Sequence, residues 1–341
     1  MTTFINIHTL ISHPSSMLNR DDSGLQKTAV FGGSVRSRIS SQCLKRAIRQ
    51  SDIYGEAVAE KSIRTNKFDD LFALCVKEMP ETDAALIENV LLNIGSKVKS
   101  EKDKESGKTS RHFDAVQPYA VGAIREAINM VESGTELKEL KKIVHIPTFD
   151  VALSGRMDAS CPDRNVEAAM SVAHSLTTHS ADIEVDWFTA CDDLAEQGSG
   201  HIGTTEFSSG VFYRYASINV DLLAKNVKAT PDDVAPIVNT IIRCFAQVSP
   251  SAKQKVFAAH NQADFVMATQ SNQPLSLANA FRKPIENSGD VMENSILALV
   301  KHYEKLTSAY ELDSTAIALD LTEIAHSDAI SLVNKISDIR F

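Results

Sequence analysis

The stretch Arg38-Ile-Ser-Ser-Gln-Cys-Leu-Lys-Arg-Ala-Ile-Arg-Gln50 changes from a strand pattern to a helix pattern within a few residues. Ser40 or Ser41 stands at the expected N-cap, where a hydroxyl accepts a hydrogen bond from a free backbone N–H. Helical spacing separates a packing face with Leu44, Ala47, Ile48 and Ser51 from a polar face with Gln42, Lys45, Arg46 and Arg49. The cationic face and the free N–H groups at the helix start predict a site for a phosphate backbone.

Positive charge is concentrated around this helix. Between Ser23 and Ser51 the chain has no Asp or Glu, although its formal net charge is −9 over 341 residues; the basic residues there are Lys27, Arg36, Arg38, Lys45, Arg46 and Arg49. The alternative is an ordinary solvated helix, whose surface normally mixes both signs of charge. The missing acids favour an anion-binding surface over that alternative.

Composition limits the class of protein. A hydrophobic content of 43% and the length of 341 residues allow a large core in one elaborated domain or two. Net acidity excludes a nucleic-acid binder coated in positive charge but permits one basic groove. The five cysteines are widely spaced and lack a Cys-x-x-Cys pair, so we expect no disulfide frame or zinc site. No targeting segment or membrane-spanning run is visible, which predicts a cytoplasmic protein without a membrane partner.

Hydrophobic periodicity outlines the elements. We expect a buried strand over 4–11, a loop over 12–24 and a helical insertion over 54–133, interrupted by a polar loop over 96–111. Strand patterns return over 149–153, 170–178, 183–191 and 211–220, followed by a helix over 231–248, strands near 256–259 and 265–268, and a helical remainder. Without the insertion, this order is the ferredoxin-like arrangement of RNA-recognition folds, in the α+β class. Topology alone does not define a function.

The segment 183–191 predicts one arm of a β-ribbon. Strand alternation puts Phe188 on the same face as Glu184 and Asp186. An aromatic ring on a polar face is a candidate stacking platform for a base, worth about 1–3 kcal/mol per base. The alternative is a small second hydrophobic cluster that covers the ring.

Catalytic signals are weak. The pairs Asp21-Asp22 and Asp192-Asp193 could hold a divalent ion for RNA cleavage, but adjacent loop acids are more often turn residues, and we find no third ligand. His174 and His179 do not have the spacing of a zinc helix, and Cys161 fits a packed thiol. The chain also lacks a dinucleotide fingerprint and a Walker motif. We therefore predict no enzyme activity, cofactor or metal.

Several blocks resemble the CasC-type backbone subunits of the type I-E CRISPR Cascade. The resemblance runs from Phe4 to about Asn279 and is carried by FINIHTLISH (4–13), LNRDD (18–22), RISSQCLKRA (38–47), ALSGRM (152–157), DWFTA (186–190), GTTEFSSGVFYRY (203–215) and AKQK (252–255). The chain departs from the family pattern over 96–111 and after Phe281.

The resemblance implies a hand-like subunit with a modified ferredoxin-like palm, helical fingers and a ribbon thumb. The implied parts are a first palm segment with the basic helix (1–55), fingers (56–146), returning palm strands (147–180), thumb (181–212) and a second palm part with C-terminal helices (213–341). In the family, copies stack head to tail into a filament that other Cascade subunits must terminate.

The resemblance also implies roles for individual residues. The RNA-backbone contacts would be Asn19, Arg20, Lys27, Ser40, Gln42, Lys45 and Arg49, with Arg46 on the same helix face. Met157 corresponds to a methionine against the bases, and Phe188 with Thr189 to thumb residues inserted at a kink in the guide; His201, Ile202 and Phe207 lie on the same ribbon. Lys138, Lys141 and Lys142 resemble a lysine-rich helix that guides target DNA.

The expected function is a non-catalytic subunit for antiviral defence. It would bind CRISPR guide RNA through sequence-independent phosphate contacts and present it for pairing with target DNA. One alternative is a metal-dependent endoribonuclease of a related CRISPR effector that uses Asp21 or Asp22. Another is a single-strand RNA-binding module that forms no filament.

Overall fold

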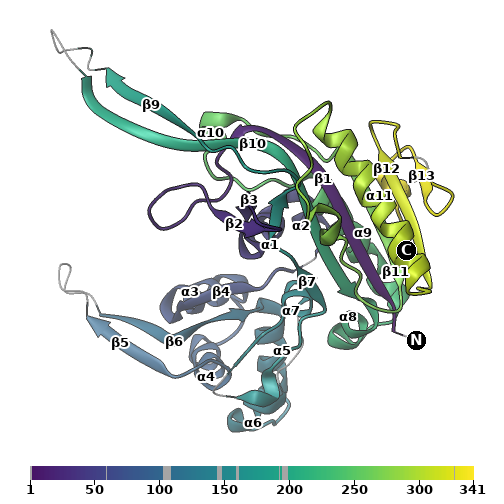
Figure 1. Ribbon diagram of the computed structural model, residues 1–341. Helices are drawn as coiled ribbons and strands as arrows, with labels where there is room; N and C mark the ends of the chain where they lie inside the picture. Colours follow the sequence, from purple (N-terminus) through teal and green to yellow (C-terminus); the bar gives the residue numbers. More distant parts are fainter. Residues whose placement is uncertain are drawn as a thin grey trace. The chain divides into compact units, whose positions relative to one another are not determined.

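The computed structural model describes residues 2–58, 60–102, 109–143, 148–158, 161–191, 193, 199–325 and 327–341. These residues form two compact units (Figure 1). The first consists of Met1–Ala57, Met170–Val220 and Val234–Phe341, and the second of Val58–Ala169 and Asp221–Asp233. No helix within the described ranges is long and apolar enough to cross a bilayer.

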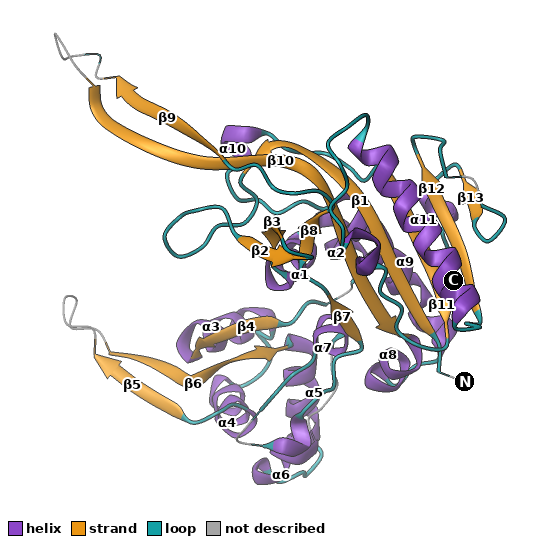
Figure 2. Ribbon diagram, viewed as in Figure 1, coloured by secondary structure: helices purple, strands orange, loops and turns teal. Residues whose placement is uncertain are grey.

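The first unit is built on one large sheet, drawn in orange in Figure 2. Its centre is β1 (Phe4–Ser16), which pairs antiparallel with β10 (Ser199–Asn219) on one side and β11 (Phe265–Ser271) on the other. The order continues outward through β12 (Ser314–Asp320) and β13 (Ser331–Val333) beyond β11, and through β8 (Ser175–Thr177), β3 (Ser34–Ile39) and β2 (Thr28–Phe31) beyond β10; β7 (Met170–Val172) and β9 (Glu184–Cys191) also pair with β10.

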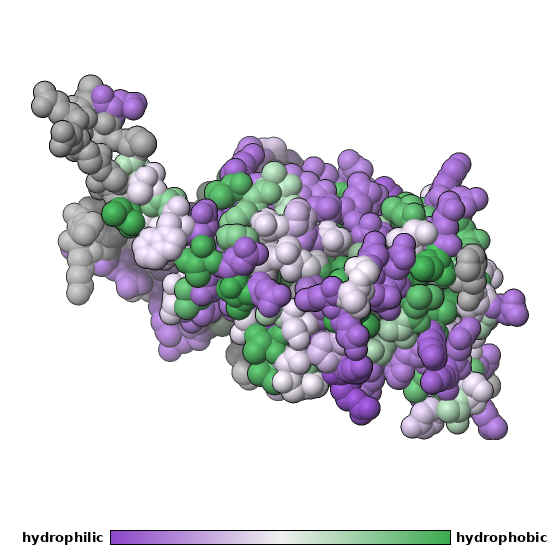
Figure 3. All heavy atoms as spheres, turned by 45° about the horizontal axis from the view of Figure 1, so that its top comes forward, coloured by the Kyte–Doolittle hydropathy of each residue, from purple (hydrophilic) through white to green (hydrophobic). Residues whose placement is uncertain are grey.

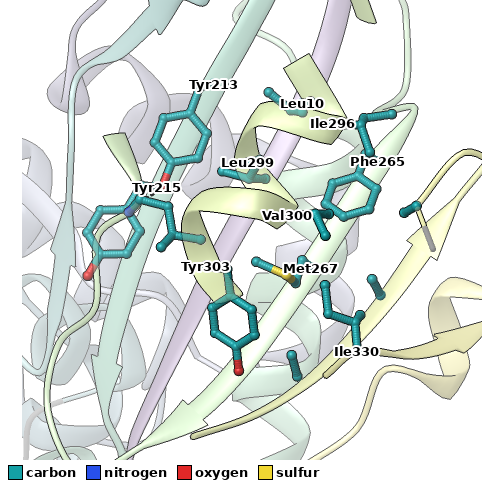
Figure 4. Packing of buried hydrophobic residues seen from close by; sticks show 14 of the residues in the cluster. Leu10, Tyr213, Tyr215, Phe265, Met267, Ile296, Leu299, Val300, Tyr303 and Ile330 are labelled. Atoms are coloured by element: carbon teal, nitrogen blue, oxygen red, sulfur yellow. Dashed lines mark hydrogen bonds between the residues drawn. The ribbon is translucent and has the colours of Figure 1, made fainter. Parts of the chain in front are cut away.

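Apolar residues from the central strands pack against a long helix. Leu10 of β1, Tyr213 of β10 and Phe265 of β11 lie in one buried cluster with side chains of α11 (Val291–Ala309), as Figure 4 shows. The helix contributes Ile296, Leu299, Val300 and Tyr303, whose spacing of three to four residues places them on one face. The other helices of this unit are α1 (Ser41–Gln50), α2 (Asp52–Ala57), α10 (Gln254–Phe257), most of α9 (Pro231–Gln247) and two 3-10 turns, Ala278–Phe281 and Ile336–Asp338.

The second unit has its own sheet and core. Strand β6 (Thr109–Tyr119) pairs antiparallel with β4 (Ile63–Lys67) and β5 (Val98–Lys102). Phe68, Leu91, Phe113 and Ile128 belong to its buried cluster. Its helices are α3 (Phe68–Glu78), α4 (Ala84–Ile94), α5 (Val121–Glu132), α6 (Leu137–Ile143), α7 (Phe149–Ser154), most of α8 (Val220–Val227) and a 3-10 turn, Pro162–Arg164.

The α+β class is confirmed, as are the strands in 4–11 and 211–220 and the helix over 231–248. The prediction of a helical insertion over 54–133 with a polar loop over 96–111 is wrong in part, because β4 lies in the insertion and β5 and the start of β6 lie within the expected loop. Strand β5 is polar and exposed along most of its length, and it forms because β6 provides a partner, with Val98 opposite the buried Phe113. Pairing of this kind leaves little signal in a single sequence.

Further errors come from short apolar runs, which periodicity cannot divide between strand and helix. The run 149–153 lies in α7, whose start is fixed by buried Asp150 accepting hydrogen bonds from the backbone N–H and hydroxyl of Ser62 at 3.1 and 2.5 Å. The expected strand near 256–259 begins within α10, where Val256 is exposed. The segment 170–178 is two short strands, and the C-terminal remainder contains β12 and β13 as well as helix.

We expect Leu10→Ala to lower the free energy of unfolding by about 2–5 kcal/mol, because Leu10 is fully buried between the sheet and α11. Urea unfolding followed by circular dichroism measures the loss. The matched control is Leu321→Ala, at a leucine that is 63% exposed, which should change stability by less than about 0.5 kcal/mol. Equal effects of the two substitutions would contradict the assignment of this core.

Candidate nucleic-acid interface

Helix α1 has the two faces that its sequence predicts. The N-cap is Ser40, whose hydroxyl accepts a hydrogen bond from the backbone N–H of Cys43 at 3.3 Å. Leu44 and Ile48 are buried, whereas Gln42 and Arg46 are exposed and Lys45 and Arg49 are partly exposed. Because Ser40 is 8% exposed and its hydroxyl caps the helix, its main role in this structure is to start α1.

Hydrogen bonds donated by backbone N–H groups hold the first loop at the start of α1. The side-chain oxygen of Asn19 accepts from the backbone N–H of Ser40 at 2.9 Å. The N–H of Lys27 donates to the carbonyl of Asn19 at 3.0 Å, and the N–H of Arg38 donates to the carbonyl of Lys27 at 2.9 Å. These bonds bring Asn19, Lys27 and the helix start together, and exposed Arg20 follows Asn19 directly.

The basic residues of this region divide into structural and surface groups. Arg36 is fully buried and donates to the carbonyls of Thr177 and Phe281 at 2.9 and 3.0 Å, so it holds the fold and is closed to a ligand. Arg38 is partly exposed; its Nε donates to the carbonyl of Thr28 at 3.1 Å and its Nη1 lies 3.1 Å from Nδ1 of His174.

The positive charges of this region act to lower the pKa values of two neighbouring side chains, His174 and Cys43. Burial lowers the pKa of His174 from its usual value, and the charges of Arg38 and Lys27 lower it further. Burial raises the pKa of Cys43, while Lys27, Arg214 and Arg46 act in the opposite direction. Burial lowers the pKa of Arg214 to about 10, so this guanidinium remains charged at neutral pH and adds to the field.

The ribbon of β9 and β10 carries exposed apolar side chains. Trp187, Ile202 and Val185 are 72%, 64% and 53% exposed, and Figure 3 shows green side chains on the described part of the ribbon at the upper left. Phe188 is 44% exposed and lies opposite Gly203. A Cβ at Gly203 would come within 2.5 Å of Cζ of Phe188, so the ring lies across the glycine.

The pairing of β9 with β10 gives the positions of the other predicted ribbon residues. Thr189 lies opposite Ile202, and Ala190 opposite His201, whose side chain is outside the described part of the structure. Phe207 is partly buried, and its ring centroid lies 6.0 Å from that of Phe257. Phe207 therefore has a packing role at the base of the ribbon.

In the second unit, Met157 is 86% exposed on a well-anchored loop. Its neighbour Asp158 is buried and lies 3.5 and 3.7 Å from the guanidinium groups of Arg156 and Arg164. The backbone N–H of Asp158 also donates to the side chain of Asn165 at 2.6 Å. The methionine is thus presented to solvent from a loop held by buried charges.

The predicted lysine segment lies in α6. Lys138 is exposed and pairs with Glu136 at 2.5 Å, which offsets its charge. The side chains of Lys141 and Lys142 lie outside the described residues.

The loop acids have turn geometry where they are described. One oxygen of Asp21 accepts from the backbone N–H groups of Ser23 and Leu25, both at 2.9 Å. Asp192 lies outside the described residues. Within the described ranges, no group of three or more His, Cys, Asp or Glu side chains is placed to hold a metal ion.

The structure adds Arg38 and His174 to the residues of this surface, although neither has a local sequence pattern that predicts it there. Their contact joins β3 to the turn between β7 and β8, residues more than a hundred positions apart, so local spacing holds no signal for it.

The chain matches the model of the CT1975-like protein family over residues 5–338. It is similar to a solved chain titled "CRISPR RNA-guided surveillance complex, pre-nicking", with 28% identity, a TM-score of 0.84, and coverage of 97% of this chain and 96% of that chain. A second solved chain, titled "CRISPR RNA-guided surveillance complex", has 25% identity, a TM-score of 0.64, and coverage of 97% and 95%. No curated protein matches.

We expect Asn19→Ala to destabilise the protein by about 1–3 kcal/mol, because it removes the acceptor for the backbone N–H of Ser40. Asn19→Asp keeps an acceptor and should retain most of that stability. Thermal unfolding compares these variants with Asn334→Ala, at an exposed asparagine. A loss for Asn19→Ala no larger than for the control would show that the bond contributes little.

We expect Gly203→Ala to displace the ring of Phe188, since the added methyl group would overlap it. Trp187 is the only tryptophan in the chain and precedes Phe188, so its fluorescence reports the change. In a Phe188→Ala background, Gly203→Ala should leave the emission unchanged. An emission change of equal size in both backgrounds would mean that the glycine and the ring do not interact.

Proposed function

Because the chain belongs to the CT1975-like protein family, we propose that it is a subunit of a Cascade-type, RNA-guided surveillance complex. The two similar structures support this proposal, since each is titled as such a complex and matches nearly the whole chain. Its RNA would be a CRISPR guide, and its partners would include other Cascade subunits.

The observation that carries RNA binding is the cationic surface at the start of α1. The exposed side of the helix presents Lys45, Arg46 and Arg49, and hydrogen bonds fix the loop with Asn19 and Lys27 beside its N-terminus. Lysine, arginine and a helix start contact phosphate without reading base identity. A guide-binding subunit needs that property, because the spacer sequence varies while the protein is constant.

The ribbon and Met157 would act on the bases. Phe188 is an aromatic ring held at a fixed place, suited to stacking or to insertion at a kink of the guide with Thr189. Met157 is exposed enough to touch a base face. The same proposal includes the remaining contacts that the family resemblance implies. Those on RNA are Arg20, Ser40, Gln42, His201, Ile202 and Phe207, and those on target DNA are Lys138, Lys141 and Lys142.

The finer assignment is a type I-E backbone subunit in the cytoplasm. Copies would stack head to tail along the guide, with 1–55, 147–180 and 213–341 as palm, 56–146 as fingers and 181–212 as thumb. A heterologous interface of this kind continues until other subunits terminate it. The assembled guide would then pair with target DNA in antiviral defence.

The proposed subunit is non-catalytic. The carboxylate of Asp21 accepts two backbone hydrogen bonds in its own turn, which accounts for this residue without a metal. Incubation of the protein with magnesium and labelled RNA tests the ribonuclease alternative. Cleavage that Asp22→Ala abolishes would replace the non-catalytic proposal with that alternative.

We expect the double variant Lys45→Ala/Arg49→Ala to bind guide-length RNA more weakly and to lower the salt dependence of the affinity by roughly two units of slope, because two cations are lost. The loss should be similar for unrelated spacers. Fluorescence anisotropy over a salt series measures both quantities.

The matched control is Lys301→Ala/Lys305→Ala, at two exposed lysines of α11, which should bind as the unmodified protein does. A loss confined to one spacer would contradict backbone recognition. Sizing by analytical ultracentrifugation with the same RNA tests the filament, and a one-to-one complex would exclude it.

A further inference from the structure

Arg38 and His174 form a pair of side chains beside the cationic loop, outside the set of residues assigned above. Nη1 of Arg38 lies 3.1 Å from Nδ1 of His174. A guanidinium group only donates hydrogen bonds and stays protonated, so Nδ1 must be the acceptor in this contact. The neutral imidazole therefore carries its proton on Nε2, and the pair keeps a further N–H donor on each side chain.

The pair is held in place by the surrounding backbone. Nε of Arg38 donates to the carbonyl of Thr28 at 3.1 Å, and the backbone N–H of Arg38 donates to the carbonyl of Lys27 at 2.9 Å. His174 is exposed and Arg38 is partly exposed. Among the described residues, no carboxylate forms an ion pair with Lys27 or Arg38. The pair thus offers hydrogen-bond donors and uncompensated positive charge to solvent.

The hydrogen-bond donors of Arg38 and His174 favour one class of ligand, an anion that presents only acceptor atoms. The pair offers donors and no free acceptor, whereas base edges present donors as well as acceptors. A phosphodiester presents only acceptor oxygens and a negative charge. Backbone hydrogen bonds link this pair to the start of α1, because Arg38 donates to Lys27, Lys27 donates to Asn19, and Asn19 accepts from Ser40.

We propose that Arg38 and His174 bind one phosphodiester of the RNA, with Nε2–H of His174 and the outer guanidinium N–H groups of Arg38 as donors. This inference rests on the proposed function, because it places the pair on the same RNA as α1. The two residues come from β3 and from the turn between β7 and β8, so the contact would extend the phosphate surface from the start of α1 to that turn.

The pair also makes the contact sensitive to pH. Besides burial, the charged groups that act on His174 are Arg38 on β3 and Lys27 in the first loop, and all three effects hold its pKa below the usual value. A phosphate bound beside the ring would raise this pKa. Because the added proton goes to Nδ1, the protonated ring would no longer accept the hydrogen bond from Arg38, and both side chains would then act only as donors to the phosphate. RNA binding would then take up a proton, so affinity should rise as pH falls through the pKa of the bound state and level off below that of the free state.

The test uses the full-length chain and a guide-length RNA at pH 7.5 and 5.5. We expect His174→Ala to weaken binding about three- to tenfold at neutral pH, as one lost hydrogen bond would, and to remove the part of the acid-dependent gain that His174 supplies. His174→Gln keeps an amide donor that cannot titrate, so it should restore affinity at pH 7.5 without that part of the gain. Arg38→Ala should lower the salt slope by about one.

The control is His302→Gln on α11. His302 also has a lowered pKa, from burial and Lys305, so its replacement should leave RNA binding unchanged at both values of pH. If the unmodified protein binds RNA and both His174→Gln and Arg38→Ala match its affinity, slope and pH profile, the inference is wrong while the proposed function stands. If the unmodified protein binds no RNA, the proposed function itself fails, and this inference fails with it.

Discussion

The pairing of β1 with β10 is the constraint on which the core and the ribbon of the first unit depend. The ladder runs from Phe4 opposite Asn219 to His13 opposite Gly210, and resumes with Ser16 opposite Ser208 after an irregularity. The same strand β10 then continues into the ribbon, where Phe207 faces Glu184. Because side chains alternate along a strand, a slip of one residue by β1 would turn Leu10 away from α11, and a slip by β10 would turn Tyr213 away. One register therefore fixes both the core and the ribbon.

The cationic surface is local, and the backbone arranges it. A chain with a net charge of −9 would repel a polyanion over much of its surface, so the stretch 23–51, which holds six Lys and Arg and no Asp or Glu, decides where one can bind. The backbone N–H groups of Ser40 and Lys27 both donate to Asn19, and these two hydrogen bonds bring the loop to the helix start. Buried Arg36 and Arg214 support the sheet and α9 from within, by bonds to backbone carbonyls.

Those features that depend on local spacing could be predicted from sequence. The cap at Ser40, the buried face of α1 with Leu44 and Ile48, and the helix α9 all follow from patterns within a single turn or two. Features that depend on distant pairing could not. The sequence around Arg36 does not predict that its guanidinium donates to the carbonyls of Thr177 and Phe281. The sequence around Val98 does not predict that its strand pairs with β6. The contact of Arg38 with His174 belongs to this second group, as does the helix at 149–153.

The position of the Phe188 ring over Gly203 reduces the entropy that the side chain would lose when another molecule stacks on it. An exposed phenylalanine on a ribbon would normally sample several rotamers, but the missing Cβ of Gly203 leaves a slot that the ring occupies. Most of the entropy lost by confining that side chain is therefore lost when the ribbon forms. Any flat molecule that stacks on the ring meets a preorganised surface, so less of the stacking energy is cancelled by ordering the protein.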